Sequence, residues 1–117
     1  MKELEFPIQN AINYTCYIES FDIAHATLRI RLKHMLYPQT MALVFSWVRY
    51  WAGPVNWTGA NFQIAKKEHC LAILRRLEHT QNMGDDFLIN ELGFRLYEAM
   101  TPSGLVQIVA REALLDS

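Results

Sequence analysis

Residues 26–34 alternate between apolar and charged or polar side chains, and no other stretch constrains the fold as strongly. Leu28, Ile30 and Leu32 fall on one side of an extended chain, and three cations fall between and after them on the other side. Side chains of a β-strand point to opposite faces with a period of two, whereas helical faces repeat every 3.6 residues. The pattern therefore predicts a strand with one buried face and one face in water.

Several further runs predict strands on either side of this one. Residues 41–51 are apolar on both faces, which is typical of a central strand covered on both sides. Gly53 and Pro54 end that run, and residues 56–65 are predicted to return as the second strand of a hairpin. Residues 13–21 are rich in Tyr, Thr, Cys and Ile, which suit a half-buried strand. Pro7 confines any strand within residues 1–10 to an edge.

The second half of the chain combines one helical pattern with a closing hairpin. Cys70, Leu74 and Leu77 recur at helical spacing within residues 66–80, which predicts a helix that packs on the sheet. Residues 87–92 fit either a short strand or an irregular segment, and residues 94–100 and 105–111 alternate as the two strands of a hairpin. The sum is one α+β domain over residues 1–117, with an antiparallel sheet of about six or seven strands and one main helix packed on it.

Composition supports a single globular domain with ordinary chemistry. The chain has 117 residues, of which 51% are hydrophobic and 20% charged, within the range of globular proteins. Cys16 and Cys70 belong to no C-x-x-C unit and are expected to be reduced core thiols. The N-terminal residues do not resemble a signal peptide, and no apolar run is long enough to cross a membrane. We therefore expect a cytoplasmic protein that binds no membrane.

The sequence contains no motif that predicts catalysis or a cofactor. Glycine-rich phosphate loops and the G-x-S-x-G elbow are missing, and the four histidines are spaced too widely to share a metal ion. The acids Asp85, Asp86, Glu91 and Glu98 follow the predicted helix, where they form either a solvated loop or an acidic patch for a basic partner. We expect a protein that is not an enzyme and needs no cofactor and no metal.

The charged face of residues 26–34 supports an alternative function. Arg29, Arg31 and Lys33, with Arg49 and nearby aromatic residues, could form a sheet surface that binds single-stranded nucleic acid through cations and base stacking. Three cations on the wet face of a strand also serve simply for solubility and edge protection. The net charge of −1 disfavours the nucleic-acid hypothesis.

The order and spacing of elements over about residues 59–113 resemble a known family. The run Ala-Asn-Phe-Gln-Ile from Ala60, the pattern Cys-Leu-x-x-Leu-x-x-Leu from Cys70, the acidic connection, and the segments Gly-Phe-Arg-Leu from Gly93 and Gly-Leu-Val-Gln-Ile from Gly104 carry this similarity. Together they resemble bacterial immunity proteins of polymorphic-toxin systems, in particular the WapI-immunity-like group. The first half of the chain does not fit that pattern.

The resemblance implies a protein-binding module that neutralises a cognate toxin by covering its active site. Nuclease toxins are usually basic where they meet nucleic acid, so an inhibitor gains from acids placed to match. Asp85, Asp86, Glu91 and Glu98 are the predicted contact residues, and Trp57 and Tyr97 are the predicted aromatic anchors. Partner identity and oligomeric state stay open.

Overall fold

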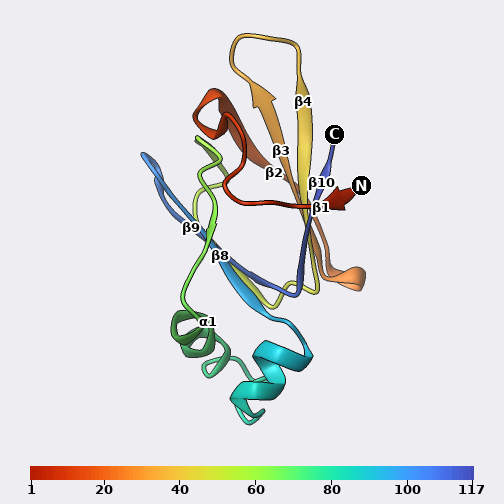
Figure 1. Ribbon diagram of the computed structural model, residues 1–117, viewed down its shortest axis with the longest axis vertical. Coiled ribbons are helices and arrows are strands. Elements are labelled where there is room, and N and C mark those ends of the chain that lie inside the picture. Colours follow the sequence, from red (N-terminus) through yellow and green to blue (C-terminus); the bar gives the residue numbers. More distant parts are fainter.

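Ten β-strands form two antiparallel sheets, and a helical layer lies at one end of the molecule (Figure 1). The computed structural model describes residues 1–117. The first sheet has the spatial order β1-β10-β4-β3-β2-β6, and the second has the order β5-β9-β8-β7. The strands of the first sheet are β1 (Lys2–Glu3), β2 (Tyr14–Asp22), β3 (Thr27–His34), β4 (Thr40–Ser46), β6 (Asn56–Thr58) and β10 (Glu112–Asp116). Those of the second sheet are β5 (Tyr50–Ala52), β7 (Gln63–Ile64), β8 (Arg95–Thr101) and β9 (Gly104–Ala110). The predicted α+β class is confirmed, with the strands divided between two sheets.

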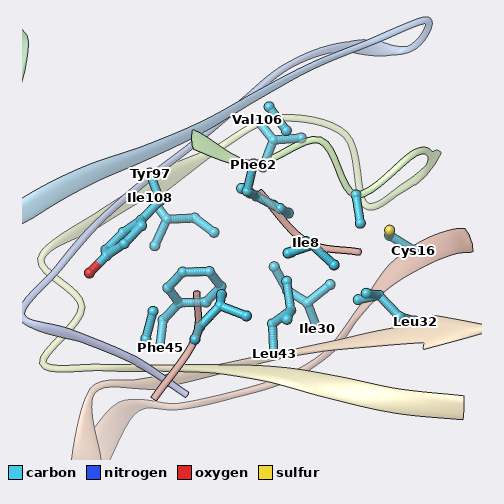
Figure 2. Close-up of a cluster of buried hydrophobic side chains, with 14 of the residues drawn as sticks. Ile8, Cys16, Ile30, Leu32, Leu43, Phe45, Phe62, Tyr97, Val106 and Ile108 are labelled. Atoms are coloured by element: carbon cyan, nitrogen blue, oxygen red, sulfur yellow. The ribbon is translucent and has the colours of Figure 1, made fainter. Parts of the chain in front are cut away.

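The two sheets pack face to face, and their inner faces form the main core (Figure 2). Leu28, Ile30 and Leu32 on β3 point into this core and are fully buried, as their alternation predicts. From the opposite sheet Tyr97 meets Phe45 of β4, with ring centroids 5.2 Å apart. The first sheet therefore has a buried inner face and an outer face that carries the charged residues of β3.

Strand β4 lies between β3 and β10 and is buried on both faces, which confirms that it is a central strand. Leu43 and Phe45 face the core, whereas Ala42 and Val44 alternate with them toward the outer face. Val44 is paired in register with Arg29 of β3. Because arginine carries a long aliphatic stem, we infer that this stem shields Val44 from water.

The chain leaves the first sheet at Ser46, earlier than the predicted strand over residues 41–51. Trp47 adopts a left-handed backbone conformation with φ of 57°, which is uncommon for a bulky residue. The chain then enters the second sheet, where β5 pairs with β9. The apolar pattern is continuous because both strands border the same core, and such a pattern cannot distinguish one long strand from two short ones.

The predicted hairpin around Gly53 and Pro54 is wrong. Strand β5 pairs with β9 of the second sheet, whereas β6 pairs with β2 of the first sheet. The predicted return strand over residues 56–65 is likewise two strands, since β7 pairs with β8. Residues 50–64 therefore connect the two sheets and do not fold back on β4.

The main helix α1 spans Lys67–Leu74 and is shorter than the predicted helix over residues 66–80. Beyond Leu74 the chain turns, and the Arg75 guanidinium donates to the carbonyl oxygens of Thr80 and Gln81, both at 3.3 Å. These side-chain hydrogen bonds stabilise the turns that follow Leu74, where the helix was predicted to continue. Residues 87–92, predicted to be a short strand or irregular, instead contain a π-helical turn, η3 (Phe87–Glu91).

A second, smaller core joins this helical layer to the second sheet. It comprises Cys70, Ile73, Leu74, Leu88, Ile89, Phe94, Leu96 and Val109. The predicted hairpin of β8 and β9 is confirmed, and its alternation separates the two cores. Tyr97 and Ile108 face the main core, while Leu96 and Val109 face the helix. The hairpin is therefore the middle layer of the fold.

The buried Thr80 side chain provides a test of where α1 ends. Its hydroxyl donates to the Leu74 carbonyl oxygen at 2.7 Å. Thr80→Val keeps the shape but removes the donor, so we expect a loss of about 1 kcal/mol in the free energy of unfolding. Urea denaturation would measure this loss. Thr58→Val, at an exposed position of β6, is the matched control and should change stability by less than about 0.5 kcal/mol. Equal losses of stability in Thr80→Val and Thr58→Val would contradict a stabilising role of the hydrogen bond from Thr80 to Leu74.

Strand β10 was not predicted from the sequence. Its residues pair with β4 on one side and with the two-residue edge strand β1 on the other. The edge position of β1 agrees with the expectation that Pro7 keeps the N-terminal segment at an edge. The two ends of the chain therefore meet in neighbouring strands of the first sheet (Figure 1).

Candidate functional site

The loop between β3 and β4 carries apolar side chains that project into water at the end of the molecule opposite to α1 (Figure 1). Met35, Leu36 and Tyr37 are 50%, 79% and 65% exposed. Ile12, in the short 3₁₀ turn η1 (Ala11–Asn13), is 68% exposed, and the Met35 N–H donates to the Asn13 carbonyl oxygen at 2.9 Å. We call these four side chains the hairpin tip. Contiguous exposed apolar residues commonly mark interaction surfaces.

The imidazole of His34 holds the hairpin tip in one conformation. Its Nδ1 accepts hydrogen bonds from the backbone N–H groups of Leu36 at 3.1 Å and Tyr37 at 3.2 Å. The ring also lies 4.9 Å from the Tyr37 ring and meets the buried Tyr14 ring edge-on at 5.3 Å. Because Nδ1 accepts both hydrogen bonds, this nitrogen carries no hydrogen in the arrangement that fixes the loop.

A hollow of about 360 Å³ lies beside the hairpin tip. Tyr14, Gln39 and Met41 form part of its wall, and the remainder comes from the N-terminal segment around Leu4 and Ile8 and from the end of β10 near Leu115. Gln39 also accepts the backbone N–H of His34, at 2.9 Å, so the wall is directly connected to the loop. This end of the molecule therefore combines a projecting apolar loop with an adjacent concavity.

The predicted acidic contact residues lie at the opposite end and mainly hold local structure. Asp85 forms an ion pair with Arg75. Asp86 accepts a hydrogen bond from the Asn90 side chain at 2.5 Å, and Glu91 is exposed at the end of η3. The cations of α1 and the following turns share this end with the acids, so the charges there are mixed. The structure does not gather these residues into a uniform acidic patch.

The other three predicted contact residues are not placed as expected. Trp57 and Tyr97 are only 3% and 5% exposed and belong to the main core, so neither is a surface anchor in this conformation. Tyr97 packs on Phe45 and stacks on Phe6. Glu98 is half-buried on β8 and accepts a hydrogen bond from the Gln107 side chain at 2.9 Å. A partner would therefore have to contact other aromatic side chains than Trp57 and Tyr97.

Most of the predicted basic surface is neutralised by acids on the same face. Glu19, at a β-bulge in β2, pairs with Arg29 at 2.8 Å and with Arg31 at 3.0 Å. Arg29 also pairs with Asp116 at 2.6 Å, and its guanidinium lowers the pKa of that carboxyl below the ordinary value. Together these pairs leave little excess positive charge for nucleic-acid phosphates.

Of the remaining two predicted cations, only Lys33 belongs to that surface. Lys33 lies on the same outer face, with its amine 5.5 Å from the centroid of the Tyr17 ring. Arg49 lies in the crossover between the sheets, where its backbone N–H donates to Val109. No specific contact therefore favours the nucleic-acid hypothesis.

The thiols and histidines take part in structure. Burial raises the pKa of Cys16 to about 12 and that of Cys70 to about 11, so both thiols stay protonated and weakly nucleophilic at neutral pH. His25 lies 2.7 Å from Asp22 at the exposed β2–β3 turn. No group of three or more His, Cys, Asp or Glu side chains is arranged to hold a metal ion.

Comparisons of the chain with family models, with curated proteins and with solved structures return no match. The resemblance to immunity proteins therefore stays a prediction. None of the helices is long or apolar enough to cross a bilayer.

Sequence reasoning missed the hairpin tip and His34. Residues 35–40 lie between the predicted strands over residues 26–34 and 41–51, and no function was predicted for them. The available signal was the run Met-Leu-Tyr directly before Pro38, since apolar residues inside a turn cannot all be buried.

Proposed function

We propose that this protein is a non-enzymatic protein-binding module that contacts its partner through the hairpin tip. The observation that carries this proposal is the exposure of four large apolar side chains, three on a loop fixed by hydrogen bonds and one on the neighbouring turn η1. A monomeric protein gains nothing from leaving such side chains in water, whereas a partner that covers them gains from their burial.

The expected energetics are those of a compact binding surface. Full burial of a side chain such as Leu36 contributes about 1.5–3 kcal/mol. Tyr37 adds a large rigid contact area, and tyrosine is enriched among the residues that dominate binding energy. Because His34 fixes the loop before binding, less conformational entropy is lost when the complex forms.

The resemblance to immunity proteins suggests that the partner is a toxin domain. Asp85, Asp86 and Glu91 lie at the far end of an elongated molecule with a longest dimension of 47 Å (Figure 1). A partner seated on the hairpin tip would not need to contact those acids. In this proposal the apolar loop provides most of the affinity, and the predicted acidic contacts are secondary.

The test uses one substitution at the centre of the tip. A photo-crosslinking residue at position 36, introduced in the producing organism, would identify the partner, which is then purified for titration calorimetry. Leu36→Ser should weaken binding by about tenfold, which corresponds to about 1.4 kcal/mol. Ile23→Ser is the matched control, because Ile23 is also an exposed aliphatic residue, at 84%, but lies at the opposite end of β3.

Three results would contradict the proposal. The first is a complex whose affinity is unchanged by both Leu36→Ser and Tyr37→Ser. The second is self-association in sedimentation experiments that Leu36→Ser abolishes, because the tip would then be a surface between two copies of this chain. The third is a salt-dependent electrophoretic shift with generic RNA or DNA that Arg31→Gln abolishes, which would support the basic outer face instead.

A further inference from the structure

A separate cavity of about 280 Å³ opens at the side of the molecule where β10 and β1 of the first sheet approach β7 and β8 of the second. Six of its nine lining residues are apolar, among them Phe6, Ile64 and Leu114, and the remaining lining is polar. Such a wall suits an aliphatic chain. Tyr97 also lines this cavity, which we call the Tyr97 cavity.

The hydroxyl group of Tyr97 is a polar atom without a partner inside the protein. Tyr97 is only 5% exposed, and its hydroxyl takes part in none of the side-chain hydrogen bonds of the structure. Figure 2 shows the hydroxyl at the outer end of the core cluster, pointing away from Phe62 and Val106. Burial raises the pKa of Tyr97, so the group is a neutral hydroxyl whose oxygen can accept a hydrogen bond.

Two carboxylates line the same cavity and have no cation bound to them. Glu3 on β1 and Glu112 on β10 are both exposed, and neither forms an ion pair. Glu3 pairs in register with Leu114, which follows Glu112 by two residues, so both acids start from the outer face of the first sheet, as does Val44, the partner of Leu114 on β4. Both carboxylates still act on the Tyr97 hydroxyl at the sheet edge, because the pKa of Tyr97 is raised first by burial and then further by the negative charges of Glu3 and Glu112.

The cation of Arg111 is already engaged. Arg111 also lines the cavity, but its Nε donates to the Leu92 carbonyl oxygen at 2.6 Å. Its guanidinium carbon lies 5.0 Å from the centroid of the half-exposed Trp47 ring. These contacts hold the guanidinium on the Trp47 side. The charge of Arg95 also reaches the Tyr97 hydroxyl, but its guanidinium lies outside the lining and donates to the Ile89 and Phe94 carbonyl oxygens. Among the residues that line the opening, the two glutamates outnumber the one cation, so the opening favours a cation over an anion.

We propose that the Tyr97 cavity receives a lysine or arginine side chain of a protein partner. The aliphatic stem packs on Ile64 and Leu114, and the cationic group lies between Glu3 and Glu112 and donates to the Tyr97 hydroxyl oxygen. Phe6 adds a ring face for the cation, since it is half-buried and stacks on Tyr97 with centroids 5.6 Å apart and planes 28° apart. The site is distinct from the hairpin tip and does not depend on the function proposed for it.

The test is a titration of the whole protein with small probes, followed by backbone amide NMR. The probes are the N-acetyl methylamides of lysine and arginine, with the norleucine analogue as the uncharged control. We expect saturable shifts of the Glu3, Ile64 and Leu114 amides, with dissociation constants on the order of 1–10 mM for the two cationic probes. The norleucine analogue should bind at least fivefold more weakly.

Three variants locate the site. Glu112→Gln and Glu3→Gln should each weaken binding of the lysine probe by threefold or more, and Tyr97→Phe, which keeps the ring in the core, by twofold or more. Glu5→Gln is the control, because Glu5 lies on the same N-terminal segment but outside this cavity. Equal binding of the norleucine analogue, shifts confined to other surfaces, or no saturation below about 100 mM probe would overturn the proposal.

Discussion

Phe45→Ala is expected to destabilise the protein by about 3–5 kcal/mol, a large part of the stability of a domain of this size. Phe45 is fully buried at the centre of the main core. Its ring contacts Phe62 and Tyr97, with centroids 6.0 Å and 5.2 Å away, so its removal leaves a cavity between the two sheets. Guanidinium denaturation followed by circular dichroism would measure the change.

A matched phenylalanine at the margin of the core provides the control. Phe21 is 38% exposed and contacts only the edge of this region, with its ring centroid 6.4 Å from that of Trp51. Phe21→Ala should cost less than about 1.5 kcal/mol, because a partly exposed ring has less transfer free energy to lose. Similar losses for the two variants would contradict the packing of the sheets around Phe45.

Removal of the His34 side chain is expected to disorder the hairpin tip. His34→Ala has no ring nitrogen to accept from the backbone N–H groups of Leu36 and Tyr37, so the stabilisation that these two hydrogen bonds give to the loop is lost. The ring contacts with Tyr14 and Tyr37 are lost as well.

The first measurement needs no partner. Amide hydrogen exchange of Leu36 and Tyr37 should lose protection in His34→Ala relative to the unsubstituted protein. His34→Asn is the matched variant, because its side-chain oxygen can replace Nδ1 as the acceptor. The His34→Asn protein should keep its protection. Equal loss of protection in both variants would exclude the Nδ1 acceptor as the cause.

The same loss of the acceptor is expected to weaken partner binding. Loss of two hydrogen bonds to the loop, about 2 kcal/mol in total, corresponds to an affinity about 30-fold lower for His34→Ala. The His34→Asn protein should change affinity by less than about threefold. An equal decrease in both variants would show that the Nδ1 hydrogen bonds do not cause the change.

The alternation of side chains predicted the elements of this fold but not their connections. Leu28, Ile30 and Leu32 face the core as expected, because a period of two depends only on local geometry. The pairing of β5 with β9 and of β10 with β4 depends on contacts far apart in the sequence. An apolar residue such as Leu115 indicates burial, but it does not show which sheet covers it.

The candidate site was harder to predict for a related reason. Residue type predicts burial only on average, so Trp57 and Tyr97 were assigned to the surface although they are core residues, and Leu36 was overlooked although it is exposed. The role of His34 is set by the loop that folds back over it. A single sequence carries no signal for that geometry.

The position of β10 has a consequence for how the chain folds during synthesis. Residues 112–116 fill the place between β4 and the edge strand β1, so the six-stranded sheet cannot close before these residues are synthesised and free to pair. Until then β4 presents an unpaired apolar edge, which is a template for aggregation. A nascent chain stalled before Glu112 would keep this edge exposed.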